Sequence, residues 1–341
     1  MIEPVESSCQ RELLLLHPTY GNKTELLRFL PCAGTLVPLL LMAGCARPSP
    51  RESLMNVPAP AGPALLAIYQ PWFGNGEHID VGYTCHDPAV LERQIARAKE
   101  LNISGFVVNW YGPRKAFEDQ TLAMLQQASV RNGFKIAVQY DEAVDHPGYA
   151  TDAVIVDLQY LYDRYISPGA GGSRSAYLRY NGRPVIFIFP KDAATDWNRI
   201  RQLTQSWPDP PLLIYKDQSA KYPDAFDGFY AWVQPGQNGW ARDGSHFGED
   251  YLEYFYRNMS ARYPDKIMVG AVWPGFDDTR ASWSRNRHMA YRCGKTFEET
   301  LRIFRHSYPS VGTSPYLLIV TWNDYEEGTD IERGIGHCKA G

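Results

Sequence analysis

The stretch from residue 316 to residue 332, YLLIVTWNDYEEGTDIE, most constrains what this chain can fold into. It begins as an unbroken apolar run, which is typical of a strand buried on both faces of a parallel sheet. It then becomes acidic, with five carboxylates in nine residues: Asp324, Glu326, Glu327, Asp330 and Glu332. In parallel α/β folds, the loops at the carboxyl ends of the strands build the ligand site. The stretch therefore predicts a buried strand that delivers acids to a site, where crowding raises the pKa of one or more of them.

These acids also have a simpler explanation. An acidic turn after a strand is commonly the start of a helix, where Asp and Glu interact favourably with the helix dipole. Here, however, Trp322, Asn323 and Asp324 precede Glu327, so one strand end combines an aromatic ring, an amide and two carboxyls. That combination is typical of sites that bind and cleave sugars.

Strand and helix patterns alternate from residue 64 onward. The expected strands are 65–73, 105–111, 134–140, 184–189, 212–215, 227–233, 266–273 and the run that starts at residue 316. The expected helices are 88–101, 119–130, 153–166, 197–205, 250–261 and 297–306, with only a weak one after the fifth strand. Eight successive β/α units favour a closed (β/α)8 TIM barrel of the α/β class over an open doubly wound sheet. Only nine residues follow Glu332, so the eighth helix is expected to be short or missing.

Amides, acids and aromatic side chains recur where the expected strands end, and these are the candidate substrate-binding residues. A structural role is the alternative for each of them, since an amide can bond a neighbouring loop and an Asp can cap a turn. The candidates, beside Asp324 and Glu327 as the reacting acids, are Tyr69, Trp72, Asn109, Trp110, Tyr111, Gln139, Asp141, Trp232, Trp273, Asp277, Trp322 and Asn323.

Several other kinds of chemistry lack their motifs in this sequence. The histidines are scattered, with no Gly-x-Ser-x-Gly turn and no His-x-His spacing, which argues against a serine hydrolase and a metal-dependent amidohydrolase. No glycine-rich phosphate loop follows the first strand, and a net charge of -4 without a basic run argues against nucleic-acid binding. We therefore expect glycoside hydrolysis by carboxylates, without a metal or an organic cofactor.

The motif at residues 321–332 resembles the strand-eight motif of glycoside hydrolase family 99, the endo-α-mannosidases and endo-α-mannanases. Its Thr-Trp-Asn-Asp-Tyr start, with an acid three residues after the Asp, is also similar to family 71, the endo-α-1,3-glucanases. Further matches to family 99 lie at residues 69–72, 105–113, 177–184, 227–230 and 274–279. The resemblance implies a barrel enzyme that acts on an oligosaccharide or polysaccharide with α linkages, an α-mannan or an α-glucan.

The resemblance also implies roles for the two acids. In family 99 the earlier acid assists the 2-hydroxyl of the substrate and the later one protonates the leaving oxygen, but this chain has Asp324 where that family has Glu. Family 71 has Asp there and inverts. The residues themselves favour Glu327 as general acid and Asp324 as base, roughly 6.5–9.5 Å apart for inversion or about 5 Å apart for a direct nucleophile. The alternative is a surface lipoprotein that captures glycans with a degenerate, non-catalytic site.

The first 63 residues do not resemble part of the barrel. Residues 28–45 have a charged start, an apolar core and small residues before Cys45, as in a bacterial lipoprotein signal, so we expect export and a lipid anchor at Cys45. Residues 1 to about 25 precede this pattern and suggest a start codon assigned too far upstream. Residues 46–63 are rich in Pro and predict a tether to the domain at residues 64–341.

The cysteines beyond the signal segment are Cys85, Cys293 and Cys338. An odd number leaves at least one free thiol, and export permits a disulfide bond. Cys293 with Cys338 is the expected pair, and Cys85 with Cys338 is the alternative. Nothing in the sequence indicates an oligomer, so a monomer is expected.

Overall fold

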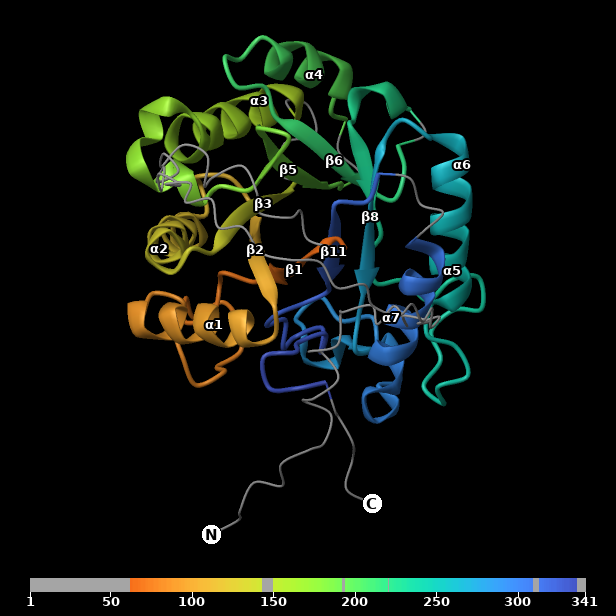
Figure 1. Cartoon of the computed structure of the whole chain (residues 1–341). Coiled ribbons are helices and arrows are strands. Elements are labelled where there is room, and N and C mark those ends of the chain that lie inside the picture. Colours follow the sequence, from red (N-terminus) through yellow and green to blue (C-terminus); the bar gives the residue numbers. More distant parts are fainter. Residues whose placement is uncertain (1–61, 143–149, 192–193, 220, 309–312, 336–341) are drawn as a thin grey trace, which may run out of the picture. The chain divides into compact units, whose positions relative to one another are not determined.

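The computed structural model describes residues 62–142, 150–191, 194–219, 221–308 and 313–335. Its centre is a parallel sheet that closes on itself (Figure 1), because β3 pairs with both β2 and β5. Around the barrel the strands run in the order β1, β2, β3, β5, β6, β7, β8 and β11, and β11 returns to β1. The expected eight-stranded TIM barrel is confirmed.

The eight barrel strands lie where the apolar runs predict them. They are β1 (Ala64–Tyr69), β2 (Ile103–Trp110), β3 (Lys135–Asp141), β5 (Arg183–Phe189), β6 (Leu212–Lys216), β7 (Gly228–Tyr230), β8 (Ile267–Val272) and β11 (Tyr316–Ile319). A two-residue strand, β4 (Arg179–Tyr180), pairs antiparallel with β5. Nearly every residue of β8 and β11 is buried, as expected for strands with helices on one side and the packed barrel interior on the other.

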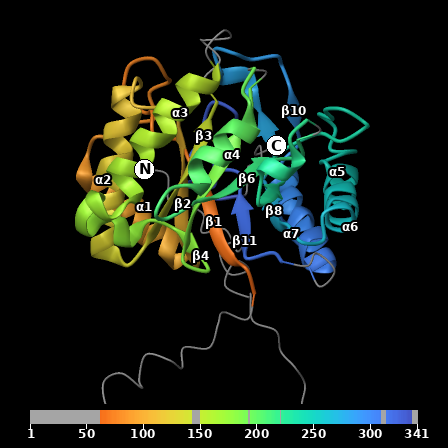
Figure 2. The ribbon, with the colours of Figure 1, turned by 90° about the horizontal axis from the view of Figure 1, so that it is seen from above.

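Helices cover the outside of the barrel between most pairs of strands. They are α1 (Pro88–Glu100), α2 (Ala116–Asn132), α3 (Ala150–Leu161), α4 (Trp197–Gln205), α5 (Glu249–Tyr254), α6 (Ser260–Arg262) and α7 (Lys295–Ser307). A turn of π-helix extends α3 through Ile166, and another joins α5 to α6. Figures 1 and 2 show α1, α2 and α3 on one side of the barrel and α5, α6 and α7 on the opposite side.

The two weakest units of the predicted alternation are also irregular in the structure. After β6 there is only a short 3-10 turn, Pro223–Ala225, in place of a helix. After β11 the described residues, which end at 335, contain no helix. Instead, this segment folds back as a set of turns, with the amide of Ile331 bonded to the carbonyl oxygen of Trp322 at 3.0 Å. The barrel is therefore closed by its strands without a regular eighth helix in the described part of the chain.

The long connection after β8 contributes a small hairpin. Its strands are β9 (Phe276–Asp277) and β10 (His288–Met289), which pair antiparallel. The amide of Asp277 bonds the carbonyl oxygen of Glu327 at 2.8 Å, so the hairpin is tied directly to the acidic turn after β11. Segments about fifty residues apart in sequence thus meet at the carboxyl ends of the strands.

The structure tests one of the two predicted cysteine pairings. Cys85 is a free, buried thiol, so its alternative pairing with Cys338 is wrong. It packs beneath the hydroxyl of Tyr69, 3.6 Å from its oxygen. Cys293 is in a disulfide bond whose partner lies outside the described residues, as does Cys338.

The predicted signal and tether, including Cys45, also lie outside the described residues. In the part of the chain that the structure describes, no helix has the length and apolar character needed to span a membrane.

Candidate active site

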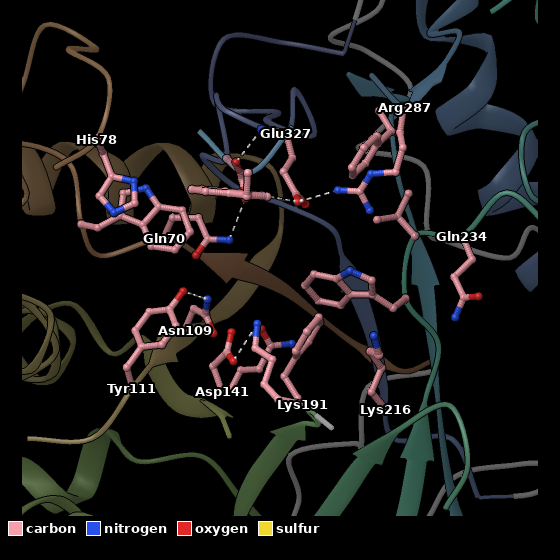
Figure 3. Close-up of a pocket in the computed structure, with 18 of the residues that line it drawn as sticks. Gln70, His78, Asn109, Tyr111, Asp141, Lys191, Lys216, Gln234, Arg287 and Glu327 are labelled. Atoms are coloured by element: carbon pink, nitrogen blue, oxygen red, sulfur yellow. Dashed lines mark hydrogen bonds and ion pairs between the residues drawn. The ribbon is translucent and has the colours of Figure 1, made fainter. Parts of the chain in front are cut away.

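A cavity of about 530 Å³ opens at the carboxyl ends of the barrel strands. Its walls combine indole and phenol rings with charged and amide side chains (Figure 3). The lining residues are Gln70, Trp72, His78, Asn109, Tyr111, Gln139, Asp141, Phe189, Lys191, Lys216, Trp232, Val233, Gln234, Pro235, Trp240, Phe276, Trp283, Arg287, Asp324 and Glu327. The volume and the mixture of flat apolar rings with polar groups suit a few sugar units.

Asp324 is the residue around which the turn after β11 folds. Its Oδ1 accepts hydrogen bonds from the backbone amides of Glu326 at 3.2 Å and Glu327 at 2.9 Å. Its own amide donates to the hydroxyl of Thr321 at 2.8 Å, directly after the strand. Its Oδ2 accepts from the side-chain amide of Gln70 at 2.9 Å, at the end of β1. One oxygen of Asp324 therefore holds the turn in place, while the other lies on the cavity side with Gln70.

Glu327 reaches the same cavity from the far end of the turn. Its Oε1 accepts from the indole N–H of Trp283 at 3.0 Å, and the guanidinium of Arg287 lies 3.6 Å away. Both partners come from the loop between β9 and β10, so this loop positions the second acid. Figure 3 shows Glu327 and Arg287 on the side of the cavity that faces Lys191 and Lys216.

Asp324 is buried and Glu327 is half-buried, and the two carboxyls act on each other electrostatically. Burial, together with the charge of Glu327, raises the pKa of Asp324 well above its usual value. Burial also raises the pKa of Glu327, although the Trp283 N–H and the Arg287 charge act in the opposite direction. Because the two acids interact, they titrate as a pair, and ionisation of one favours protonation of the other. Such a pair holds both an acid and a base at one site.

Further polar groups line the wall between β2 and β6. The side-chain amide of Asn109 donates to the hydroxyl of Tyr111 at 2.8 Å, and that of Gln139 donates to Tyr230 at 3.0 Å. Asp141 lies 3.0 Å from the ammonium of Lys191, and burial raises the pKa of Asp141 to about 6 against the effect of that cation. These side chains are fixed by one another before any ligand arrives.

Eight of the predicted site residues line this cavity together. They are Trp72, Asn109, Tyr111, Gln139, Asp141, Trp232, Asp324 and Glu327. They come from five different strand ends, as expected when parallel strands deliver side chains to one edge.

The other six predicted residues do not line the cavity, and side-chain alternation explains two of them. Successive side chains of a strand point to opposite faces. Gln70 faces the cavity, so Tyr69 faces α1, where its hydroxyl donates to Gln94 at 2.7 Å. In the same way, the indole of Trp110 points away from the barrel interior and donates to Asp119 of α2 at 3.1 Å. Both rings are packing residues here.

The remaining four serve the structure around the cavity. Asn323 bonds both the amide and the carbonyl oxygen of Gln70, at 2.7 and 3.0 Å, and so ties the acidic turn to β1. Trp322 is buried against Phe106, and Trp273 donates to the carbonyl oxygen of Phe247 at 3.0 Å. Asp277 accepts from the amide and hydroxyl of Thr279 and lies 3.3 Å from His288. These residues position the site without lining it.

The structure also brings in residues outside the predicted set. Lys191 and Lys216 lie at the ends of β5 and β6, where the strand-end rule that selected the other candidates applies equally. His78, Trp240 and Arg287 come from long loops, and nothing in the pattern of those loops indicates that they return to the cavity. His78 stacks on Trp72 with ring centres 4.5 Å apart and bonds Glu326 at 2.7 Å.

Among the described residues, no group of three or more His, Cys, Asp or Glu side chains has the arrangement of a metal site. Through its own side chains the cavity offers carboxyls that can donate or accept protons.

Comparison with known proteins places this geometry in a family context. The model of glycosyl hydrolase family 71 matches residues 81–333. The glycoprotein endo-alpha-1,2-mannosidase-like protein of Mus musculus is 24% identical over 277 residues, which cover 74% of this chain and 56% of that protein. Its Homo sapiens counterpart is 24% identical over 282 residues, with the same coverage. The chain spans about half the length of these curated relatives.

Solved structures show the same fold. The GH99 endo-alpha-mannosidase from Bacteroides thetaiotaomicron in complex with BIS-TRIS-Propane superposes with a TM-score of 0.62 at 20% identity, covering 79% of this chain and 86% of that one. A structure titled glycoside hydrolase-like protein superposes with a TM-score of 0.58 at 16% identity, over 79% and 86% of the two chains. At these identities the likeness concerns the barrel itself.

Proposed function

Because the chain belongs to glycosyl hydrolase family 71, we propose that it cleaves an α-linked glycan, an α-mannan or an α-glucan, with Asp324 and Glu327 as the reacting acids. One observation carries the assignment of these residues. A single turn after β11 places both carboxyls on the wall of a cavity whose other walls include Trp72, Trp232 and Trp283. The flat indole rings suit the apolar faces of sugars, and the paired acids suit acid–base cleavage of a glycosidic bond.

In this proposal Glu327 donates a proton to the leaving oxygen and Asp324 accepts one. The hydrogen bonds of Asp324 support its role as the base, although burial and the charge of Glu327 raise its pKa. Asp324 accepts three N–H donors, from Glu326, Glu327 and Gln70, and such donors stabilise a carboxylate. Once Asp324 is ionised, its charge favours the protonated form of Glu327, which is then ready to act as an acid. Asp324 takes its proton either from water or from the 2-hydroxyl of the substrate.

The experiment is incubation of the purified protein with α-mannan and, separately, with α-1,3-glucan, followed by chromatography of released oligosaccharides. Glu327→Gln serves as the matched inactive control, since it keeps the size of the side chain and removes its proton. New products from one polymer, absent with the control, support the proposal and identify the glycan. Binding of a polymer without any product would instead favour a protein that captures glycans.

The anomeric form of the first product separates the two chemical routes. Proton NMR of the fresh reaction reports whether the new reducing end has the configuration of the substrate. Inversion would place a water between Asp324 and the sugar, whereas retention would favour assistance by the substrate's 2-hydroxyl.

On the strength of the pattern at residues 28–45, we also propose that the protein is exported with a lipid on Cys45. A monomer remains the expected oligomeric state. Expression in a bacterium with labelled palmitate is expected to label the wild type and not Cys45→Ala. Label on both proteins, or on neither, would contradict the anchor, and gel filtration of a detergent-free form that begins at residue 46 reports the oligomeric state.

A further inference from the structure

Two lysines form one wall of the cavity, opposite the acids. Lys216 is the last residue of β6, and Lys191 follows the end of β5 by two residues. Both are lining residues, and Figure 3 shows them across the cavity from Glu327. Acid–base cleavage of a neutral glycan does not call for two ammonium groups at this position.

The two ammonium groups are held against the same aromatic ring. The Nζ of Lys216 lies 4.0 Å from the centre of the Phe189 ring, and the Nζ of Lys191 lies 5.2 Å from it. Cations at such distances from an aromatic face are attracted to it. The ring therefore holds two ammonium groups close together, where their positive charges repel each other.

Only one of these charges has a carboxylate partner. Lys191 pairs with Asp141 at 3.0 Å. Lys216 has no carboxylate oxygen within 4.0 Å among the residues that the structure describes, and its neighbour Asp217 is occupied by Gln234 and by the hydroxyl of Tyr251. Burial and the charge of Lys191 both lower the pKa of Lys216, although the charges of Asp217, Asp141 and Glu327 oppose them. Among the described residues, Lys216 is thus an ammonium group of this wall that has no carboxylate oxygen in ion-pair contact, although the charge of Asp217 next to it acts on it.

Arg287 also lines the cavity, but its guanidinium already pairs with carboxylates of the protein. The Nε of Arg287 lies 2.7 Å from the buried carboxylate of Asp278, and its Nη2 lies 3.6 Å from Glu327. Its charge is therefore used within the protein. The ammonium group without a carboxylate in ion-pair contact among the described residues lies on the lysine wall, which faces Glu327 across the cavity (Figure 3).

We propose that Lys191 and Lys216 form a subsite for an oxyanion carried by the glycan, a carboxylate, sulfate or phosphate on a sugar unit bound beside the unit that is cleaved. The subsite rests on the proposed glycan-cleaving function, because it assigns a substrate class to the same cavity. An anion there would accept charge-assisted hydrogen bonds from both ammonium groups, and the partly buried setting strengthens them. Asp141, bonded to Lys191, fixes the position of that lysine.

Binding measured without turnover tests the subsite independently of hydrolysis. Glucuronate, glucose 6-sulfate and glucose 6-phosphate are titrated into the full chain by calorimetry or ligand-observed NMR, with methyl α-glucoside as the neutral comparison. We expect at least one anionic sugar to bind about tenfold more tightly than the neutral one. The three anions together identify which oxyanion fits.

Three variants assign the effect to the wall. Lys216→Met and Lys191→Met keep a long apolar side chain and are expected to abolish the preference for the anion. Lys216→Arg keeps the charge and is expected to keep the preference. Lys221→Met removes a fully exposed lysine outside the cavity and serves as the matched control. Thermal melting checks that each variant is folded.

Two results would overturn the subsite: equal binding of neutral and anionic sugars by the wild type, or an anion preference that persists in folded Lys216→Met. Either result leaves hydrolysis of a neutral α-glycan untouched. Conversely, an anion preference in a protein that cleaves nothing would refute the proposed function and keep the subsite.

Discussion

Replacing Trp283 by Phe tests the role assigned to Glu327. The indole N–H of Trp283 donates to Oε1 of Glu327 at 3.0 Å. Its ring meets Trp72 and His78 edge-on, each with ring centres 6.1 Å apart. Phe keeps an aromatic ring in this position and removes the donor, so the change acts mainly on the carboxyl.

The expected shift follows from the energy of one hydrogen bond. A bond to a charged group contributes about 1.5–3 kcal/mol, and the lower end applies because Trp283 is 40% exposed. Since 1.36 kcal/mol corresponds to one pKa unit, loss of the donor shifts the pKa of Glu327 by about one unit. The sign is upward, because the N–H favours the ionised form and its loss favours the protonated form.

The assay is the pH dependence of kcat/KM on the polymer that the enzyme cleaves. A general acid works when protonated, so the alkaline limb of the profile is expected to move up by about one unit in Trp283→Phe. Trp240→Phe also alters an indole of the cavity wall, but no hydrogen bond joins that indole to Glu327, so it is expected to leave the limb in place. A shift of the acidic limb alone would make Glu327 the base, and unchanged limbs would refute the reasoning.

Three further predictions address catalysis and stability. Glu327→Gln is expected to lower kcat at least a hundredfold while polymer binding in a pull-down assay stays nearly intact, a loss within the usual range of general acid catalysis; a folded variant with more than a tenth of the wild-type activity contradicts the assignment. Gly112→Ala is expected to lower the free energy of unfolding by about 3 kcal/mol, since Gly112 has a φ of +88° and a Cβ there would lie 2.5 Å from the Asp157 carboxylate. Gly82→Ala, with a φ of +83° and open space around it, is expected to cost only about 1 kcal/mol in urea unfolding, and equal losses would rule out the steric argument. The pKa of Asp141 is raised to about 6, so this residue destabilises the folded state progressively as pH rises from about 4 through 6. The free energy of unfolding of Asp141→Asn, relative to that of the wild type, is therefore expected to increase by roughly 3 kcal/mol between pH 4 and pH 7. A stability difference that stays constant with pH contradicts this.

The strands could be predicted from the sequence because each is marked by an apolar run of consecutive residues. A run such as residues 267–273 has no polar side chain, and burial on both faces requires that composition wherever the strand lies in the barrel. Successive β/α units form either a closed barrel or an open sheet, and a count of eight favoured the barrel. The sequence also predicted a short or missing helix after the last strand, and the described residues, which end at 335, contain none there.

Site residues at the ends of strands could be predicted from the sequence, whereas those in the long loops were harder to predict. Asp324 and Glu327 follow a buried strand directly, so the sequence alone places them at the carboxyl edge. Which of two adjacent residues faces inward depends on the register of the strand, and a one-residue error exchanges the two faces. The prediction took adjacent residues of both faces, so Tyr69 and Trp110 were expected in the cavity together with Asn109 and Tyr111, whereas the structure places Gln70, Asn109 and Tyr111 there.

The sequence by itself determined the eight-stranded scaffold, the acidic turn and the likeness to glycoside hydrolases, because apolar periodicity and a contiguous motif are written in consecutive residues. Tertiary structure alone decided that the loop carrying Trp283 and Arg287 folds onto Glu327, and that two lysines share the ring of Phe189. Such contacts join side chains from loops and strands that are distant in sequence. Their energies depend on distance and burial, which exist only after the barrel has closed.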